Sequence, residues 1–234
     1  MNECIPAPPL SAGSRRTIAV HKSLLEKNAA VAQRNREAFA AQRLFVANWT
    51  SAPGAGKTLL IERLLADLGR RWRIGVIVAD LATDRDAERL GRHGAPVLQL
   101  TTGTLCHLEA AMIARAVEHF RLDELDLLII ENVGNLVCPA AYDLGESLRV
   151  VVNAVTEGED KPVKYPTMYR TADVVLLNKI DLADAAGFDW PAGRRWLAHA
   201  APQARVFDVS ARTGAGMATW HEYLDTTIRR SRGD

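Results

Sequence analysis

Apolar residues along this chain follow two alternating patterns. Short runs that are apolar on both faces predict buried strands, at 43–50, 73–80, 95–100, 125–132, 147–155, 172–180 and 204–210. Longer segments with apolar residues at helical spacing predict helices, at 17–42, 57–69, 106–120 and 216–229. Because the strands alternate with helices and are apolar on both faces, we expect an α/β fold: a mostly parallel sheet with helices on both faces.

The N-terminus differs in composition from the rest of the chain. Residues 1–16 are rich in proline and small residues and predict a flexible arm, which leads into the helix at 17–42. Residues 43–234 predict a single domain, because the sequence shows no internal repeat and no second set of strands and helices that would form a separate domain.

Composition narrows the class of protein. The formal net charge of +1 gives no basis for bulk nucleic-acid binding, and no apolar stretch approaches the length of a membrane span. The N-terminus lacks the apolar core of a signal peptide, and three cysteines are too few for a disulfide framework. We therefore expect a cytoplasmic protein with neither a nucleic-acid nor a membrane partner.

The stretch "SAPGAGKT" at 51–58 follows a predicted strand and opens a predicted helix, which is the context of a phosphate-binding loop. Glycines there let backbone N–H groups approach phosphate oxygens, and the helix N-terminus adds a positive dipole. Lys57 would reach the outer phosphates and the Thr58 hydroxyl would hold Mg²⁺. Ser51 stands where the usual pattern has its first glycine. The nucleotide-binding residues expected in this loop are Gly54, Ala55, Gly56, Lys57 and Thr58.

Two later motifs predict that the nucleotide carries guanine. "NKID" at 178–181 ends an apolar strand, where Asp181 would accept hydrogen bonds from guanine N1–H and its amine. Lys179 would lie along the base, and Asn178 would tie this loop to the phosphate loop. "SARTG" at 210–214 follows the last strand, so backbone N–H groups at Ser210 and Ala211 would meet the guanine oxygen.

Two acids at strand ends complete the expected phosphate site. Glu131 would orient Mg²⁺ through water, and Asp80 leads into a polar stretch, 81–89, that could sense the nucleotide. We expect Lys57, Asp80 and Glu131 to serve hydrolysis and Thr58, Asp80 and Glu131 to serve Mg²⁺. Thr83 and Asp86 are further candidates, although Asp86 equally suits a helix cap. No motif positions an arginine finger, which predicts slow intrinsic hydrolysis that accelerates on association.

Cys106, His107 and Cys138 form a candidate site for Ni²⁺ or Zn²⁺. The first two are neighbours at the start of a predicted helix, and Cys138 follows Glu131 by seven residues. Two thiolates and an imidazole suit these ions, and a set of three leaves coordination open for exchange. The seven residues from Glu131 to Cys138 span at most about 24 Å. A displacement of Glu131 could therefore move Cys138.

Five segments together resemble the HypB family, the GTPases that assist nickel insertion into NiFe hydrogenases. They are "NWTSAPGAGKTLLIERLL", "GTLCHLEA", "ENVGNLVCPAAYDLGE", "VTEGEDKPVKYPTMY" and "LLNKIDL". In that family serine is usual at position 51. The resemblance implies a P-loop fold of the SIMIBI type, a homodimer when GTP is bound, and a Zn²⁺/Ni²⁺ site near the dimer interface. It also implies a hydrogenase maturation partner and the hydrogenase large subunit as clients.

Matched residue by residue, the family's metal ligands fall on Cys106, His107 and Cys138. The resemblance further places Lys161 and Lys164 near the nucleotide or the dimer contact. The N-terminus departs from the cysteine-rich nickel motif of some members, since it has only Cys4 and no histidine-rich tract.

Other interpretations stay open at this point. A urease-type nickel GTPase would share "ENVGN", although "CHLEA" and "VCPAAYDLGE" favour the hydrogenase branch. A guanine-nucleotide regulator with merely packed cysteines predicts no stoichiometric metal. A small-molecule kinase is disfavoured because it needs neither "NKID" nor "SARTG". The metal that binds, and whether one or both protomers supply its ligands, are left open as well.

Overall fold

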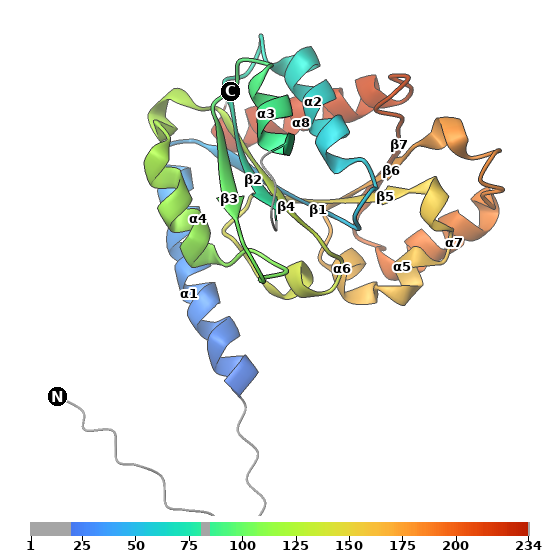
Figure 1. Ribbon diagram of the computed structural model, residues 1–234, viewed down its shortest axis with the longest axis horizontal. Helices are drawn as coiled ribbons and strands as arrows, with labels where there is room; N and C mark the ends of the chain where they lie inside the picture. Colours follow the sequence, from blue (N-terminus) through green and yellow to red (C-terminus); the bar gives the residue numbers. More distant parts are fainter. Residues whose placement is uncertain (1–19, 81–84, 234) are drawn as a thin grey trace, which may run out of the picture.

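A computed structural model describes residues 20–80 and 85–233 of the chain (Figure 1). The expected arm at 1–16 lies outside the described residues, as do Thr83 and Asp84. Within the described ranges, none of the helices combines the length and the apolarity that a membrane crossing needs.

Seven strands form one sheet in the described part of the chain, and every neighbouring pair is parallel. Their spatial order is β3-β2-β4-β1-β5-β6-β7. The strands are β1 Phe45–Ser51, β2 Ile74–Asp80, β3 Val97–Thr101, β4 Leu127–Gly134, β5 Leu148–Ala154, β6 Val174–Asn178 and β7 Arg205–Asp208. All residues of β1, β5 and β6 are buried, which fits their mostly apolar composition, although buried polar residues such as Asn48 and Asn153 interrupt it.

The helices pack on both faces of this sheet (Figure 1). They are α1 Val20–Ala41, α2 Lys57–Leu68, α3 Arg85–Gly91, α4 Ala110–Ala116, α5 Lys161–Lys164, α6 Pro166–Arg170, α7 Trp190–Ala200 and α8 Met217–Arg232. Among the described residues, short 3₁₀ turns η1 to η5 lie at Val117–His119, Leu122–Glu124, Cys138–Ala141, Val155–Glu157 and Ile180–Leu182. The sheet, the flanking helices and the order of the elements confirm the expected α/β fold.

One predicted helix starts too early, and others were missed. The helix expected at 106–120 begins only at Ala110, because Glu109 has an extended backbone and Cys106 and His107 lie in the preceding loop. Helices α3, α5, α6 and α7 were not predicted. Of these, α5 and α6 are at most five residues long, too short for a helical period to show in the sequence.

Three clusters of buried side chains hold the layers together. One face of the sheet packs against α2, α3 and α8, with Trp49 and Trp220 in edge contact at 5.9 Å between ring centroids. The other face is covered by α6 and α7 at one end and by α1 and α4 at the other. Neighbouring residues of β1 point to opposite faces, so Val46 and Trp49 belong to different clusters. The carboxyl ends of the strands are left for the loops that carry the candidate chemistry.

Candidate nucleotide and metal sites

The phosphate loop connects β1 to α2 across residues 52–56. Gly54 and Gly56 have φ angles of +76° and +94°, which favour glycine, and Gly56 directly precedes the first turn of α2. A Cβ on Gly56 would lie 2.6 Å from Asn178 Nδ2. Ser51 is the last residue of β1 and has an extended backbone, so this position does not need glycine.

Glu131 lies within β4, three residues before the strand ends at Gly134, and is 2 % exposed. Its Oε1 accepts a hydrogen bond from Thr58 Oγ1 at 2.7 Å and lies 3.3 Å from Lys57 Nζ. Among the described residues Glu131 Oε2 has no hydrogen-bond partner, although it is buried. A buried carboxylate oxygen without a partner, beside a hydroxyl at a helix N-terminus, fits the hard-oxygen environment of Mg²⁺.

A cavity of about 390 Å³ opens beside these groups. It is lined by the phosphate loop, by Glu131, and by Asp80 at the end of β2. Asp86 and Arg89 of α3 also line it. Arg89 pairs with Glu62 at 2.5 Å and with Asp86 at 3.4 Å. Sequence reasoning named Asp86 of this helix but not Arg89, because no motif singles out an arginine within the stretch 81–89.

The expected guanine-reading segments meet the phosphate loop through buried hydrogen bonds. Asn178, at the end of β6, donates from Nδ2 to Ala55 O at 2.9 Å and accepts from the Ala211 N–H at 3.2 Å. Lys179 has a left-handed backbone, with φ of 61°, and its Nζ donates to Gly54 O at 2.7 Å. One amide therefore holds three loops in register.

The side chains that would recognise the base differ in exposure. Asp181 lies in η5 and is exposed, so its carboxylate is free to accept from a ligand. Ser210 is fully buried, and its Oγ accepts from the Thr213 N–H at 3.1 Å, which shapes the turn that carries Ala211. The predicted residues thus come together along the carboxyl edge of the sheet.

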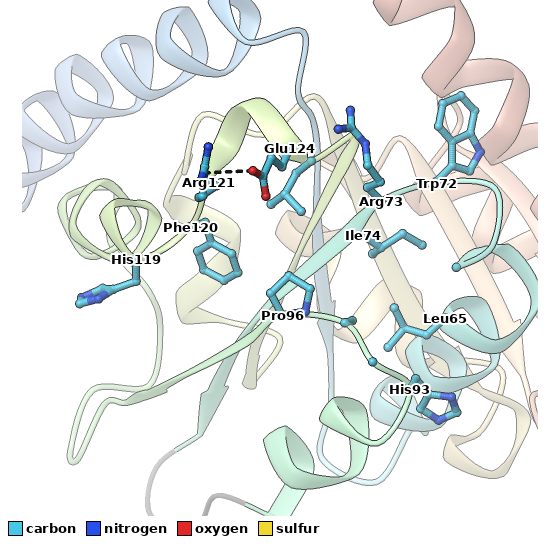
Figure 2. A pocket seen from close by; sticks show the side chains of 14 residues that line it. Leu65, Trp72, Arg73, Ile74, His93, Pro96, His119, Phe120, Arg121 and Glu124 are labelled. Atoms are coloured by element: carbon cyan, nitrogen blue, oxygen red, sulfur yellow. Dashed lines mark ion pairs between the residues drawn. The ribbon is translucent and has the colours of Figure 1, made fainter.

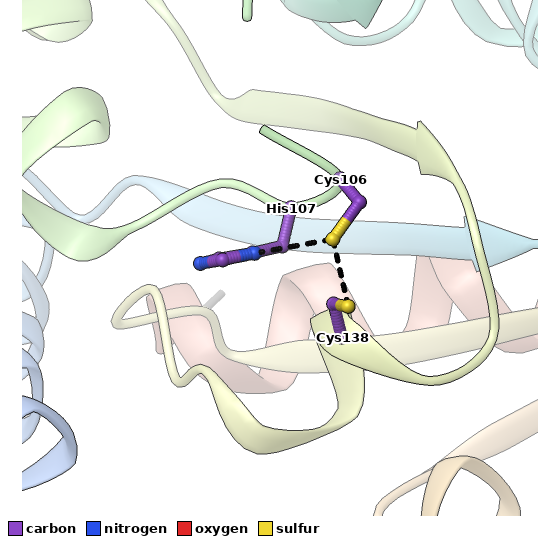
Figure 3. A group of neighbouring side chains, drawn as sticks. All are labelled: Cys106, His107 and Cys138. Atoms are coloured by element: carbon purple, nitrogen blue, oxygen red, sulfur yellow. Dashed lines mark hydrogen bonds between the residues drawn. The ribbon is translucent and has the colours of Figure 1, made fainter. Parts of the chain in front are cut away.

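Cys106, His107 and Cys138 form a second group, here called the Cys–His cluster (Figure 3). Their potential ligand atoms all lie within 4.8 Å of one another. The two sulfurs are 2.7 Å apart, beyond the length of a disulfide, and both thiols are free. His107 Nδ1 lies 3.8 Å from Cys106 Sγ and faces the sulfurs. Three soft-to-borderline donors facing one point suit Zn²⁺ or Ni²⁺.

The surroundings of the cluster favour its use as a ligand set. The His107 ring stacks on Tyr142, with centroids 3.9 Å apart and planes at 25°. Burial lowers the pKa of His107, which keeps the ring neutral at pH 7. The hydrogen bond with Cys138, followed by burial, raises the pKa of the Cys106 thiol, so metal binding would have to displace its proton. His107 Nε2 lies 3.7 Å from Glu109 Oε1, leaving Nδ1 for an ion.

Comparison with known proteins decides the family. The CobW/HypB/UreG nucleotide-binding domain model matches residues 45–208. Hydrogenase maturation factor HypB of Azotobacter vinelandii is 47 % identical over 229 residues, which cover 97 % of this chain and 73 % of that protein. The chain belongs to the HypB family. The fold is accordingly that of a P-loop GTP-binding domain.

Solved structures agree with this assignment. The crystal structure of HypB from Helicobacter pylori in complex with nickel is 38 % identical, with a TM-score of 0.83 over 88 % of this chain and 97 % of that one. The signal recognition particle receptor FtsY from Elizabethkingia anophelis, in complex with GDP, is 14 % identical. Its TM-score of 0.51, over 81 % of this chain and 70 % of that one, shows the SIMIBI-type fold alone.

Of the two lysines expected near the nucleotide or the dimer contact, Lys164 lies beside the Cys–His cluster. Lys164 lines a cavity of about 450 Å³ together with His107, Cys138 and Tyr142. Lys161 pairs with Glu157 at 2.9 Å, and Lys164 pairs with Asp160 at 2.6 Å. Neither lysine lines the phosphate cavity.

A further cavity, of about 680 Å³, opens at the amino ends of β2, β3 and β4 (Figure 2). Apolar side chains such as Trp72, Ile74 and Phe120 line it, and the Arg121–Glu124 ion pair at 3.1 Å lies at its edge. In this HypB-family fold the nucleotide loops occupy the opposite, carboxyl ends of the strands. This cavity is therefore separate from the nucleotide site.

Proposed function

We propose that this protein is a GTP-hydrolysing nickel metallochaperone that assists the maturation of NiFe hydrogenase. The observation that carries the proposal is the Cys–His cluster, formed by the loops that follow β3 and β4 in a P-loop domain whose relatives are hydrogenase maturation factors. A solved relative of the same family holds nickel. Nickel is the cargo in this scheme, and Zn²⁺ is the other ion that the same ligands accept.

GTP is bound through the groups gathered at the carboxyl edge of the sheet. Lys57 and the backbone of residues 54–58 hold the phosphates, and the carboxylate of Asp181 reads the guanine. The N–H groups of Ser210 and Ala211 donate to Ala215 O and to Asn178 Oδ1, so they would have to exchange these partners to meet the guanine oxygen. Asn178 and Lys179 keep both loops in place through their bonds to Ala55 and Gly54. Thr58 and Glu131, with Asp80 across the cavity, would hold Mg²⁺, which neutralises phosphate charge during hydrolysis.

The nucleotide and the metal are linked along one segment of chain. Glu131 is in β4, the strand ends at Gly134, and Cys138 opens the next turn, η3. A change at Glu131 when the γ-phosphate leaves is transmitted over a few residues to one ligand of the cluster. Hydrolysis would thereby change metal affinity.

Dimer formation with GTP would take place around the cluster. Leu105 and Val137, which directly precede the two cysteines, are 38 % and 63 % exposed. Large apolar side chains exposed beside a metal site are typical of a surface that a second protein covers. We propose that a second copy covers it when GTP is bound, and that a hydrogenase maturation partner and the hydrogenase large subunit then receive the metal in the cytoplasm.

The test is a titration of the purified protein with Ni²⁺ and with Zn²⁺, in GDP and in a non-hydrolysable GTP analogue, with the molar mass measured on the same samples. We expect stoichiometric binding whose affinity depends on the nucleotide, and a dimer with the GTP analogue. Cys106→Ala and Cys138→Ala should lose the bound metal.

Two controls make the outcome specific. His199 is exposed on α7, so His199→Ala should bind metal as the wild type does, whereas His107→Ala should not. GTP and ATP hydrolysis are measured side by side. If no metal binds stoichiometrically in either nucleotide state, the protein is a guanine-nucleotide switch whose cysteines only pack. If ATP is hydrolysed as fast as GTP, Asp181 does not select guanine.

A further inference from the structure

Helix α1 buries two asparagines on the face that it turns toward the domain. Asn28 and Asn35 are 8 % and 6 % exposed. They are seven residues apart, about two helical turns, and so lie on the same side of the helix. Buried amides are costly unless they are hydrogen-bonded. A helix that needed only to cover the sheet would place apolar residues there, so these two side chains call for an explanation.

Each amide bonds to both segments that follow the ligands of the Cys–His cluster. Asn28 Nδ2 donates to Asp143 O at 2.7 Å, and its Oδ1 accepts from the Ala110 N–H at 2.8 Å. Asn35 Nδ2 donates to Ala110 O at 2.9 Å and to Leu144 O at 3.0 Å. Ala110 comes three residues after His107, and Asp143 five residues after Cys138.

Other contacts hold the second segment against the helix. Arg36 donates from Nη2 to both carboxylate oxygens of Asp143, at 2.9 and 2.8 Å. Gly145 has a φ of +90°, and a Cβ there would lie 2.6 Å from Ala32 O. The backbone of this segment therefore packs directly on α1, without room for a side chain between them.

We propose that Asn28 and Asn35 are positioning residues that set the metal affinity of the Cys–His cluster. Neither touches the ligand atoms. Each joins the segment that carries Cys106 and His107 to the segment that carries Cys138, at the fixed spacing of one carboxamide. A ligand set that is held close together before the ion arrives loses less freedom when the ion binds. This inference rests on the proposed metal-binding function and names the part of the fold that prepares the site.

The test compares single variants of α1 in competition titrations with a Zn²⁺-binding or Ni²⁺-binding chromophoric chelator. We expect Asn28→Ala and Asn35→Ala to weaken metal binding by about tenfold or more, the scale of supporting residues around metal ligands. Arg34→Ala is the matched control, because Arg34 is exposed beside Asn35 on the same helix. GDP affinity should stay within about twofold of wild type in all of them, since no bond of either asparagine reaches the nucleotide loops.

Two aspartate variants separate positioning from a general loss of stability. Asn28→Asp keeps the acceptor for the Ala110 N–H and loses one donation, so its metal affinity should fall between wild type and Asn28→Ala. Asn35→Asp loses both donations and should resemble Asn35→Ala. Gln203→Ala removes an amide that donates to three backbone carbonyls elsewhere, so it should lower the melting temperature without changing metal affinity.

The outcomes are distinct. Wild-type metal affinity in both alanine variants would overturn the inference and leave the proposed function intact. So would metal affinity that merely follows the melting temperature across all variants, Gln203→Ala included. A wild-type protein that binds no metal would overturn the proposed function and this inference together.

Discussion

Asn178 offers the sharpest test of how the nucleotide site is built. Its amide is 2 % exposed and joins the "NKID" segment to the phosphate loop at Ala55 and to the "SARTG" segment at Ala211. Asn178→Ala removes both hydrogen bonds and leaves a buried carbonyl and a buried N–H without this partner. Because this one amide contacts both neighbouring loops, the substitution should loosen the place where the base and the phosphates bind.

The size of the effect follows from the bonds lost. Each hydrogen bond contributes about 1 kcal/mol net, so the pair contributes about 2 kcal/mol. If GDP binding has to order the loops again, this amounts to roughly 30-fold weaker affinity. Since the bonds are present without ligand, the free energy of unfolding should fall as well, lowering the melting temperature of a domain of this size by roughly 4–8 °C.

The assay is equilibrium binding of fluorescently labelled GDP, with thermal unfolding of the same samples. Gln203→Ala is the control, because this amide also anchors a loop by hydrogen bonds, to Tyr169, Arg170 and Ala172 at the other end of the sheet. It should lower the melting temperature and leave GDP affinity unchanged. Wild-type GDP affinity in Asn178→Ala, or an equal loss in Gln203→Ala, would refute the reasoning.

Three further predictions follow from single residues. Glu131→Gln should slow GTP hydrolysis by about 100-fold or more and weaken its dependence on Mg²⁺, because the uncharged amide no longer orients the ion. Phosphate release measured at fixed times reports both quantities, and an unchanged rate would contradict a role of Glu131 in hydrolysis. Gly56→Ala should cost GDP affinity at least tenfold, because its Cβ would lie 2.6 Å from Asn178 Nδ2 at a φ of +94°, and calorimetry that shows wild-type affinity would exclude this steric account. Hydrogen bonds from Arg73 hold the pKa of Asp126 below its usual range. A carboxyl whose pKa is depressed in the folded state stabilises the protein above about pH 4, and this contribution is lost as the pH falls through the folded-state pKa. The free energy of unfolding of Asp126→Asn should therefore be lower than that of wild type at pH 7, by roughly 1–3 kcal/mol. That difference should shrink by pH 3, as chemical denaturation at the two pH values will show.

The sequence alone determined the features that are local. A phosphate loop needs one strand, a few residues with particular backbone torsions and the start of a helix, and all of these are contiguous in "SAPGAGKT". The parallel sheet was predictable for a related reason, since strands buried on both faces are predominantly apolar. The sequence did not predict α5 and α6, or the start of α4 at Ala110 instead of Cys106. A few residues are too short a stretch to show helical periodicity.

Only the tertiary structure decided which distant segments meet. Cys106 follows β3 and Cys138 follows β4, and these strands flank β2 in the order β3-β2-β4, which brings the two sulfurs together. The same holds for Arg89 at the phosphate cavity and for Asn28 and Asn35 at the segments that carry the metal ligands. No sequence motif marks these residues. The sequence around a helical asparagine or arginine does not differ according to whether its side chain faces water or bonds to backbone more than seventy residues away. Their roles depend on the packing of α1 and α3 against the sheet, which sequence periodicity does not specify.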